Sequence, residues 1–132
     1  MSDDVLADVI GYLEPRLTGC YVSDTAPAET AFDRHLPVVL IRDLPGGGED
    51  IPWQAAAGPL TDVFAFDVDI YATTREQCRD LSRHIRGLLY AMTLDPEVNA
   101  KNITEVVGFS RRPDHNPRIL RDGAEFELRR PM

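Results

Sequence analysis

The sequence predicts an α+β fold: a two-layer sandwich in which two helices cover a mostly antiparallel sheet of four to five strands. Two observations lead to this prediction. Thr61–Met92 reads as a long amphipathic strand that runs directly into a long amphipathic helix. Shorter strand-like segments, separated by turns that contain glycine or proline, lie on both sides of this unit. The expected order is α-β-β-β-α-β-β in a single domain, residues 1–132.

The first expected helix spans roughly Asp3 to Leu17. Its apolar side chains recur at steps of three and four residues: Val5, Leu6, Val9, Ile10, Leu13 and Leu17. Ser2 is a candidate N-cap, because a serine hydroxyl accepts a hydrogen bond from a free N–H of the first turn. Pro15 and then Gly19 make the end of this helix irregular.

Two strands are expected next. Cys20–Ser23 begins the first, and Leu36–Leu44 forms the second, whose continuous apolar run indicates a strand that is buried on both faces or lies centrally in the sheet. The segment Pro45–Pro59 then holds four glycines and three prolines, so we expect a flexible loop without a regular element. It carries the only tryptophan, Trp53, which either packs back onto the core or meets a partner.

The long strand has two different faces. One carries Phe64, Phe66, Val68 and Ile70, and the other carries Val63, Ala65, Asp67, Asp69 and Tyr71. The carboxylates of Asp67 and Asp69 need water or cations, so we expect helices to cover the sheet on one side only.

The long helix is expected to begin with a capping box, in which Thr73 and Glu76 each accept from the backbone N–H of the other. Its expected apolar stripe consists of Cys78, Leu81, Ile85, Leu88 and Met92. Four arginines lie largely on the other side: Arg75, Arg79, Arg83 and Arg86. This helix has to fold back near its parent strand, because the connection between them is so short.

Two further strands close the chain. Ile103–Ser110 is the first, and Arg111–Pro117 is a turn rich in charge and proline. Ile119–Arg130 is the last, with Phe126 and Leu128 on one face and Glu125, Glu127 and Arg129 on the other. We expect a tight turn at Asp122–Gly123 to interrupt it.

The composition is that of an ordinary globular domain, with 43% hydrophobic and 27% charged residues. No apolar run approaches the roughly 20 residues of a membrane span, so we expect no membrane contact. The acidic start, MSDDVLADVI, lacks the basic region of a secretory signal, so we expect no export signal and synthesis in the cytoplasm.

The charge is unevenly distributed. Residues 1–72 hold 13 acidic and 3 basic side chains, whereas residues 73–132 hold 9 and 11, which gives the whole chain a net charge of −8. An acidic protein does not bind nucleic acid through an electrostatic footprint. A chain with one acidic and one basic half is, however, suited to meet copies of itself, acidic side to basic side.

Histidine and cysteine residues show no pattern typical of chemistry. His35, His84 and His115 are far apart and share no metal-ligand spacing. Cys78 lies on the apolar stripe of the helix, where a small buried thiol is the simpler interpretation. Cytoplasmic synthesis disfavours a disulfide with Cys20, and the sequence leaves open whether the two pair. We expect no cofactor and no metal.

The most suggestive acidic pair is Asp67 and Asp69, which lie on one strand face at a separation of roughly 7 Å. Paired carboxylates can perform acid–base chemistry, but no histidine or third ligand accompanies these two. A solvated or subunit-facing surface is the better interpretation. Gly46–Gly48 is not followed by a phosphate-binding motif. We therefore expect no catalytic residues and no enzyme activity.

One resemblance sharpens this interpretation. The segment FAFDVDIYATTREQCRDLSRHIRGLL resembles the central segment of tail terminator (tail completion) proteins of long-tailed, non-contractile bacteriophages. In that family a hydrophobic–acidic strand ends in a short turn and leads into a helix with a cationic face. LPVVLIRDL and SRRPDHNPRIL...FELRR are similar to the flanking strands, so the resemblance covers about three quarters of the chain.

The resemblance implies a structural virion protein of the tail and neck. Such proteins form a ring, usually a hexamer, that caps the tail tube, ends its polymerisation and joins it to the head–neck connector. DNA passes through the central channel without specific binding. The residues tentatively assigned to contacts with neighbouring proteins are Trp53, Asp67, Asp69, Arg111, Arg112, Arg129 and Arg130.

Three alternatives remain open. Two are structural: another neck or head-closure component, since small α+β ring proteins occupy several positions there, and a tube subunit, although tube subunits tend to carry more strand and form long polymers. The other is a small two-layer α+β enzyme or ligand-binding module, for which Asp67, Asp69 and His115 would be the foremost polar groups. Fold alone does not separate these functions.

Overall fold

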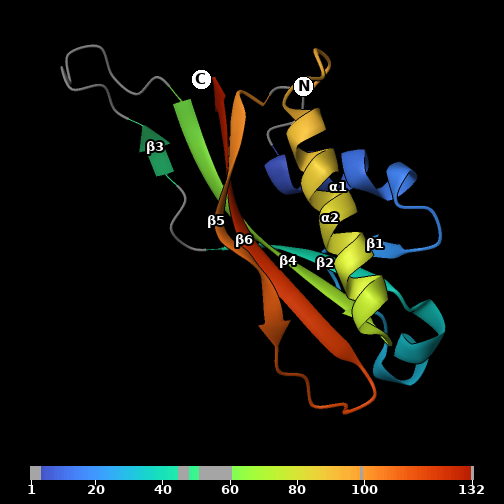
Figure 1. Ribbon diagram of the computed structural model, residues 1–132. Coiled ribbons are helices and arrows are strands. Elements are labelled where there is room, and N and C mark those ends of the chain that lie inside the picture. The colour runs from blue at the N-terminus through green and yellow to red at the C-terminus, as the bar shows by residue number, and fades with distance from the viewer. Residues whose placement is uncertain (1–3, 45–47, 51–60, 99, 132) are drawn as a thin grey trace.

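The predicted fold class is confirmed. A computed structural model describes residues 4–44, 48–50, 61–98 and 100–131 and shows an α+β protein (Figure 1). The elements in order are α1 (Val5–Leu13), the 3-10 helix η1 (Glu14–Arg16), β1 (Tyr21–Ser23), the 3-10 helix η2 (Glu29–His35), β2 (Val38–Asp43), β3 (Gly48–Asp50), β4 (Thr61–Ala72), α2 (Arg75–Met92), β5 (Asn102–Arg112) and β6 (Leu120–Pro131). No helix in the described ranges is both long and apolar enough to cross a membrane.

The strands form one sheet in the order β1-β2-β4-β6-β5, and β3 adds to the first residues of β4. All neighbouring strands are antiparallel except β1 and β2. The central strand, β4, pairs along its whole length with β6, from Thr61 opposite Pro131 to Ala72 opposite Leu120. Helices α1 and α2 lie on the same side of this sheet (Figure 1).

Helix α1 is shorter than the predicted segment. It is capped by Asp4, whose side chain accepts from the backbone N–H of Ala7 at 3.0 Å. The predicted cap, Ser2, lies outside the described residues. The helix ends at Leu13, and the chain tightens into η1, where Pro15 occupies a first-turn position that needs no N–H. Gly19 then turns the chain toward β1 with φ +84°, a conformation that favours glycine.

Helix α2 begins one residue later than predicted. Thr74, not Thr73, is the cap, and its hydroxyl accepts from the backbone N–H of Gln77 at 3.1 Å. The buried residues of the helix are Cys78, Ser82, Ile85, Leu89 and Met92. Leu81 and Leu88, which were predicted to belong to the stripe, are only half-buried. The buried residues are separated by steps of four, three, four and three residues, which match the helical pitch of 3.6, and so Ser82 and Leu89 lie at the centre of the buried stripe.

The main core lies between the sheet and the two helices. It includes the predicted apolar face of β4 together with buried residues of α1, α2 and β6. Two phenylalanines from neighbouring strands, Phe66 and Phe126, stack at its centre with ring centroids 5.7 Å apart.

The opposite face of the sheet is not left bare, contrary to the prediction that only one side is covered. A second, smaller cluster buries Tyr71 and Ile119 beside two residues of β2. Phe32 of η2 packs on it and meets the Tyr71 ring edge-on at a centroid distance of 5.2 Å. The polar connection before β2 therefore covers part of this face of the sheet, which its composition did not predict.

Two other predictions about strands are wrong. The segment Pro45–Pro59 does contain a regular element, because Gly48–Asp50 forms β3 and pairs with Thr61–Val63. Asp122–Gly123 does not interrupt β6, since both residues pair with β4 on one side and β5 on the other.

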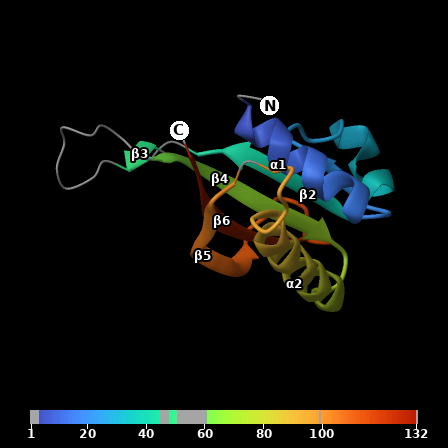
Figure 2. The ribbon, with the colours of Figure 1, turned by 90° about the horizontal axis from the view of Figure 1, so that it is seen from above.

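The pair β3–β4 forms the stem of a projecting hairpin. In Figures 1 and 2 this stem extends away from the two helices, beyond the part of the sheet that they cover. Seen from above, the layer of helices and the layer of strands are both visible, and β3 lies at the far end of the sheet from η2 (Figure 2).

A matched pair of leucine substitutions checks the assignment of the α2 stripe. Leu89 is fully buried, whereas Leu94, just after the helix, is 83% exposed. Leu89→Ala should lower the free energy of unfolding by about 2–5 kcal/mol, because it removes core contacts and leaves a cavity. Leu94→Ala should change it by less than about 0.5 kcal/mol. Urea denaturation followed by circular dichroism measures both, and equal effects would contradict this packing.

Candidate functional site

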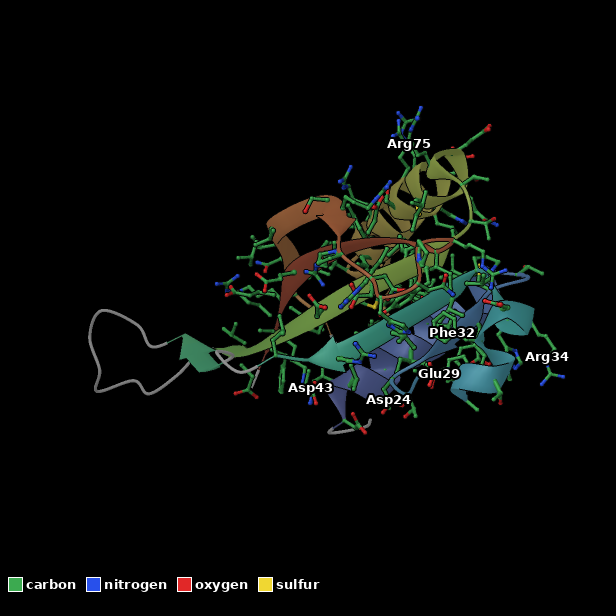
Figure 3. All side chains as sticks on the ribbon, turned by 90° about the horizontal axis from the view of Figure 1, so that it is seen from below. Asp24, Glu29, Phe32, Arg34, Asp43 and Arg75 are labelled. Carbon is green, nitrogen blue, oxygen red and sulfur yellow. The ribbon has the colours of Figure 1, made fainter. Side chains whose placement is uncertain are left out.

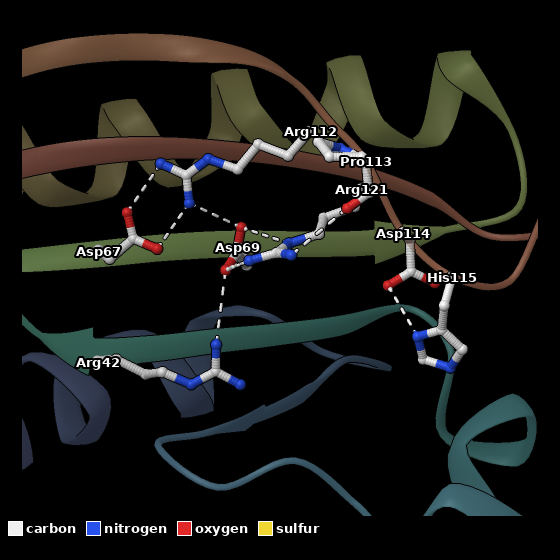
Figure 4. Close-up of polar contacts among 8 residues, drawn as sticks. All are labelled: Arg42, Asp67, Asp69, Arg112, Pro113, Asp114, His115 and Arg121. Atoms are coloured by element: carbon white, nitrogen blue, oxygen red, sulfur yellow. Dashed lines mark hydrogen bonds and ion pairs between the residues drawn. The ribbon is translucent and has the colours of Figure 1, made fainter.

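The most distinctive polar feature is a cluster of arginines and aspartates on the sheet face opposite the helices (Figure 4). We call it the Arg–Asp cluster: Arg42, Asp67, Asp69, Arg112 and Arg121. The two carboxylates come from β4, and the guanidinium groups come from β2, β5 and β6, the strands on either side. Strand alternation puts Asp67 and Asp69 on the same face, as the sequence predicts.

Arg112 joins the two carboxylates. Its Nη1 and Nη2 donate to the two oxygens of Asp67 at 2.6 and 2.8 Å, and Nη1 also donates to Asp69 Oδ1 at 2.9 Å. Such a bidentate contact is among the stronger hydrogen-bond arrangements in proteins. The hydrogen bond to Asp67 is the main cause that raises the pKa of the Arg112 guanidinium, and the negative charges of both aspartates add to it. Arg112 is therefore held as a permanent cation between them.

Asp69 is the centre of the cluster and is only 1% exposed. Arg121 donates to both of its oxygens, from Nε at 3.0 Å and from Nη2 at 2.7 Å. Arg42 Nη1 lies 3.7 Å from Oδ2, which is an ion pair but not a hydrogen bond. A buried lone carboxylate costs several kcal/mol, so this burial requires the surrounding guanidinium groups.

This arrangement differs from the prediction of a solvated acidic face. Asp69 is buried and accepts three hydrogen bonds from arginines of its own chain, and the Asp67 side chain is largely covered. The reason lies in the neighbouring strands: β6 and β5 contribute Arg121 and Arg112 on the same face. A role of Asp67, Asp69 and Arg112 in contacts with other proteins stays a prediction.

Gly123 makes the cluster possible. It sits in β6 opposite Asp69 and next to the Arg112 guanidinium. A Cβ atom at this position would overlap the Cζ, Nε and Nη1 atoms of Arg112. The absence of a side chain therefore provides the space through which Arg112 crosses β6 to reach Asp67.

An open pocket of about 790 Å³ adjoins the cluster. We call it the outer pocket. It lies between η2, the connection from β5 to β6 and the sheet, and its walls include Phe32, Tyr71 and Ile119 as apolar side chains and Arg42 and Arg121 as cations. Burial, reinforced by the negative charge of Asp69, raises the pKa of the Tyr71 phenol, so this hydroxyl stays protonated at neutral pH.

His115 lies at the rim of the outer pocket and does not form a catalytic dyad. Its Nδ1 is 3.9 Å from Asp114 Oδ1, and its Nε2 is 3.9 Å from Glu29 Oε1. Both distances exceed hydrogen-bond range, and the side chain is 81% exposed. The histidine therefore has no fixed base or orienting group in the geometry described.

Arg111 lies apart from the cluster. On the opposite face of the sheet, its Nε donates to Asp122 Oδ1 at 2.6 Å, close to Cys78 of α2. That hydrogen bond raises the pKa of the Arg111 guanidinium. The adjacent residues Arg111 and Arg112 thus point to opposite faces, as strand alternation requires.

The arginines at the end of β6 also separate. Arg129 Nη2 lies 3.4 Å from Glu127 Oε2 on the outer face. Arg130 is buried on the other face, 3.6 Å from Asp8 of α1 and over the Phe64 ring. The remaining predicted contact residue, Trp53, lies outside the described residues.

Two members of the Arg–Asp cluster were not found from the sequence: Arg42 and Arg121. Arg121 lies four residues before Glu125 and shares its face of the strand, so alternation alone puts it with the outer charges. Pairing it with Asp69 requires knowing that β6 is the neighbour of β4. Arg42, at the end of an apolar run, gives no signal for a partner before the sheet order is known.

The described residues contain no group of three or more His, Cys, Asp or Glu side chains that could hold a metal ion. Cys20 and Cys78, the two cysteines of the chain, are not joined in a disulfide. Burial raises the pKa of both thiols, so neither is activated as a thiolate.

Comparison with known proteins adds no family: the chain matches no protein-family model and no curated protein.

Two glycine substitutions test the geometry of the cluster. Gly123→Ala should lower the free energy of unfolding by about 1–3 kcal/mol, because the added methyl displaces Arg112 from the buried carboxylates. Gly87 lies on the exposed side of α2, where an added Cβ would meet nothing within 4 Å apart from its chain neighbours and the backbone of its own helix, so Gly87→Ala should raise the free energy of unfolding by about 0.4–1 kcal/mol. Thermal or urea unfolding of both variants measures this difference in sign. A Gly123→Ala variant as stable as the parent would refute the cluster geometry.

Proposed function

We propose that this chain is a structural component of a bacteriophage tail, a terminator that forms a ring, caps the tail tube and joins it to the head–neck connector. The observation that carries the proposal concerns the segment that resembles tail terminators, FAFDVDIYATTREQCRDLSRHIRGLL. It covers most of β4 and most of α2, the central strand and the longer helix of the fold. The resemblance therefore concerns the unit around which the rest of the chain is built.

The surfaces left over by this fold suit an assembly subunit. The stem of the β3–β4 hairpin projects from the body of the sheet, where a neighbouring protein can reach it (Figures 1 and 2). Strand β5, 11 residues long, forms one edge of the sheet and exposes Val106 and Val107 by 51% and 42%. An open strand edge with apolar side chains is a common site of contact between chains.

The acidic composition suits a ring through which DNA passes. Each subunit carries a formal charge of −8, so a hexamer is strongly negative. A negative lumen repels the phosphate backbone and lets DNA pass without sticking. In this proposal the partners are the tail tube protein and the head–neck connector protein, and the site of action is the virion tail and neck.

Purified protein tests the proposal directly. We expect negative-stain images to show rings with a central hole, and light scattering to give a mass that is a fixed multiple of 14.8 kDa. When added to polymerising tail tube protein, the chain should bind at tube ends and stop elongation. Lysozyme or another monomeric protein of similar mass serves as the control for non-specific effects on tube length.

Two outcomes would count against this function. One is a protein that stays monomeric at every concentration and leaves tube length unchanged. The other is a ring that binds a head connector but never a tube end, which would favour another neck or head-closure role.

A ligand-binding module is the second candidate, and the outer pocket is the observation that favours it. The pocket offers about 790 Å³, within the usual size range of small-molecule sites, and puts Arg42 and Arg121 beside the apolar Phe32. A small aromatic carboxylate such as benzoate matches that chemistry. We expect saturable NMR shifts at Tyr71 and Ile119 if this candidate is correct, and weaker binding in Arg42→Gln. An absence of saturable shifts would rule against it.

A further inference from the structure

A row of three arginines on α2 has no charged partner in the described part of the chain. Arg75, Arg79 and Arg83 are exposed and lie four residues apart, so they follow one another at about 6 Å along the helix. Arg86 prolongs this row toward the sheet, where its Nη2 donates to Glu105 of β5 at 2.9 Å. We call Arg75, Arg79 and Arg83 the arginine row.

The arginine row faces the β5 end of the sheet. The contact of Arg86 with β5 fixes this direction, because Arg86 and Arg79 are seven residues apart and share a side of the helix. The neighbouring row of Glu76, Asp80 and His84 lines a hollow that it shares with residues next to β1.

Acidic side chains gather at the opposite edge of the sheet, beside β1 and β2. Asp24 follows β1, Glu29 begins η2, and Asp43 ends β2; all three are exposed. We call Asp24, Glu29 and Asp43 the acidic edge. The Glu29 side chain is 91% exposed, and its one ion-pair partner within 4 Å in the described ranges is the His115 imidazole, at 3.9 Å, which pairs with it only when protonated. Figure 3 shows Arg75 across the molecule from all three residues. Arg34 lies at the end of this edge, and Arg118 also lies close to it, paired with Asp33 of η2 at 3.5 Å.

The two surfaces match each other in charge but cannot meet within one chain, because they lie at opposite ends of the sheet. In two copies they can meet, and the pair then still has one free surface of each kind, one on each copy. Such a head-to-tail contact is heterologous, and it produces a closed ring or an open filament but not a two-fold dimer. The exposed Val106 and Val107 of β5 lie at the same end of the sheet as the arginine row and add apolar area there.

We infer that the arginine row of one subunit docks on the acidic edge of the next subunit, and that this contact builds the ring; the inference rests on the proposed function and names its subunit interface. A second copy fits better than DNA as the occupant. Glu76 and Asp80 are exposed directly beside the row, and the chain as a whole is negative, so phosphates meet repulsion around the three cations. The acidic edge of a second copy avoids this repulsion, because its carboxylates can pair with the three arginines at short range.

Charge reversal at each surface gives the first test. Arg79→Glu with Arg83→Glu should raise the dissociation constant of the assembly by at least about tenfold, because like charges then face each other across the contact. Asp24→Arg with Glu29→Arg should have the same effect. Lys101→Glu with Arg16→Glu, which makes an equal change of net charge at two exposed sites outside both surfaces, should leave assembly within about threefold of the parent. Light scattering over a concentration series measures the mass, and circular dichroism checks that each variant folds.

Mixing the two reversed variants gives the decisive test. Each alone has two surfaces of the same sign, so each should remain a monomer. A one-to-one mixture should regain the parent's mass, because every contact in an alternating ring then joins opposite charges. Rising salt should dissociate both the parent ring and the mixed ring.

The outcomes separate the inference from the proposed function. Parent rings that persist in Arg79→Glu with Arg83→Glu would overturn the inference and leave the ring intact as a proposal. The same result combined with a loss of DNA binding would assign the row to nucleic acid instead. A mixture that fails to reassemble also overturns the inference. A parent chain that is monomeric both alone and with tail tubes overturns the inference and the proposed function together.

Discussion

A carboxylate that is buried at the centre of a sheet needs hydrogen bonds and positive charge around it. In this protein the carboxylate of Asp69 imposes that constraint. Arginines on both sides of β4 compensate the charge of Asp69: Arg121 from β6, Arg112 from β5 and Arg42 from β2. Arg112 reaches the carboxylate across the gap at Gly123. The cluster ties four strands together, β2, β4, β5 and β6. Removing any one arginine leaves less compensation for the same buried charge.

Much of the fold could be predicted from local patterns. Alternation in β4 and helical spacing in α2 gave the correct central unit, since each burial pattern depends on only one element. Boundaries were off by one residue where two threonines competed for one cap, Thr73 and Thr74. The turn expected at Asp122–Gly123 was wrong, because the glycine serves a long-range contact with Arg112 that turn propensities do not report.

The candidate site was harder to predict than the fold. Asp67 and Asp69 were recognised as unusual, but their partners lie 43 to 52 residues further along the chain or on a strand well before them. A charge on a strand face therefore looks solvated until the sheet order is known. Adjacent arginines were also grouped as one surface, whereas Arg111 and Arg112 point to opposite faces. The arginine row of α2 was easier, because an exposed helical face needs no knowledge of other elements.

The two faces of β4 also protect the sheet against misalignment during folding. A shift of one residue between β4 and β6 would turn Asp69 toward α2 and the apolar core, and would turn Ile70 toward the guanidinium groups. Such a misaligned state would lose hydrophobic burial on one side and charge compensation on the other at the same time. The cluster thus discriminates between correct and incorrect strand pairings, which a sheet with a uniformly apolar or uniformly polar outer face would do far less sharply.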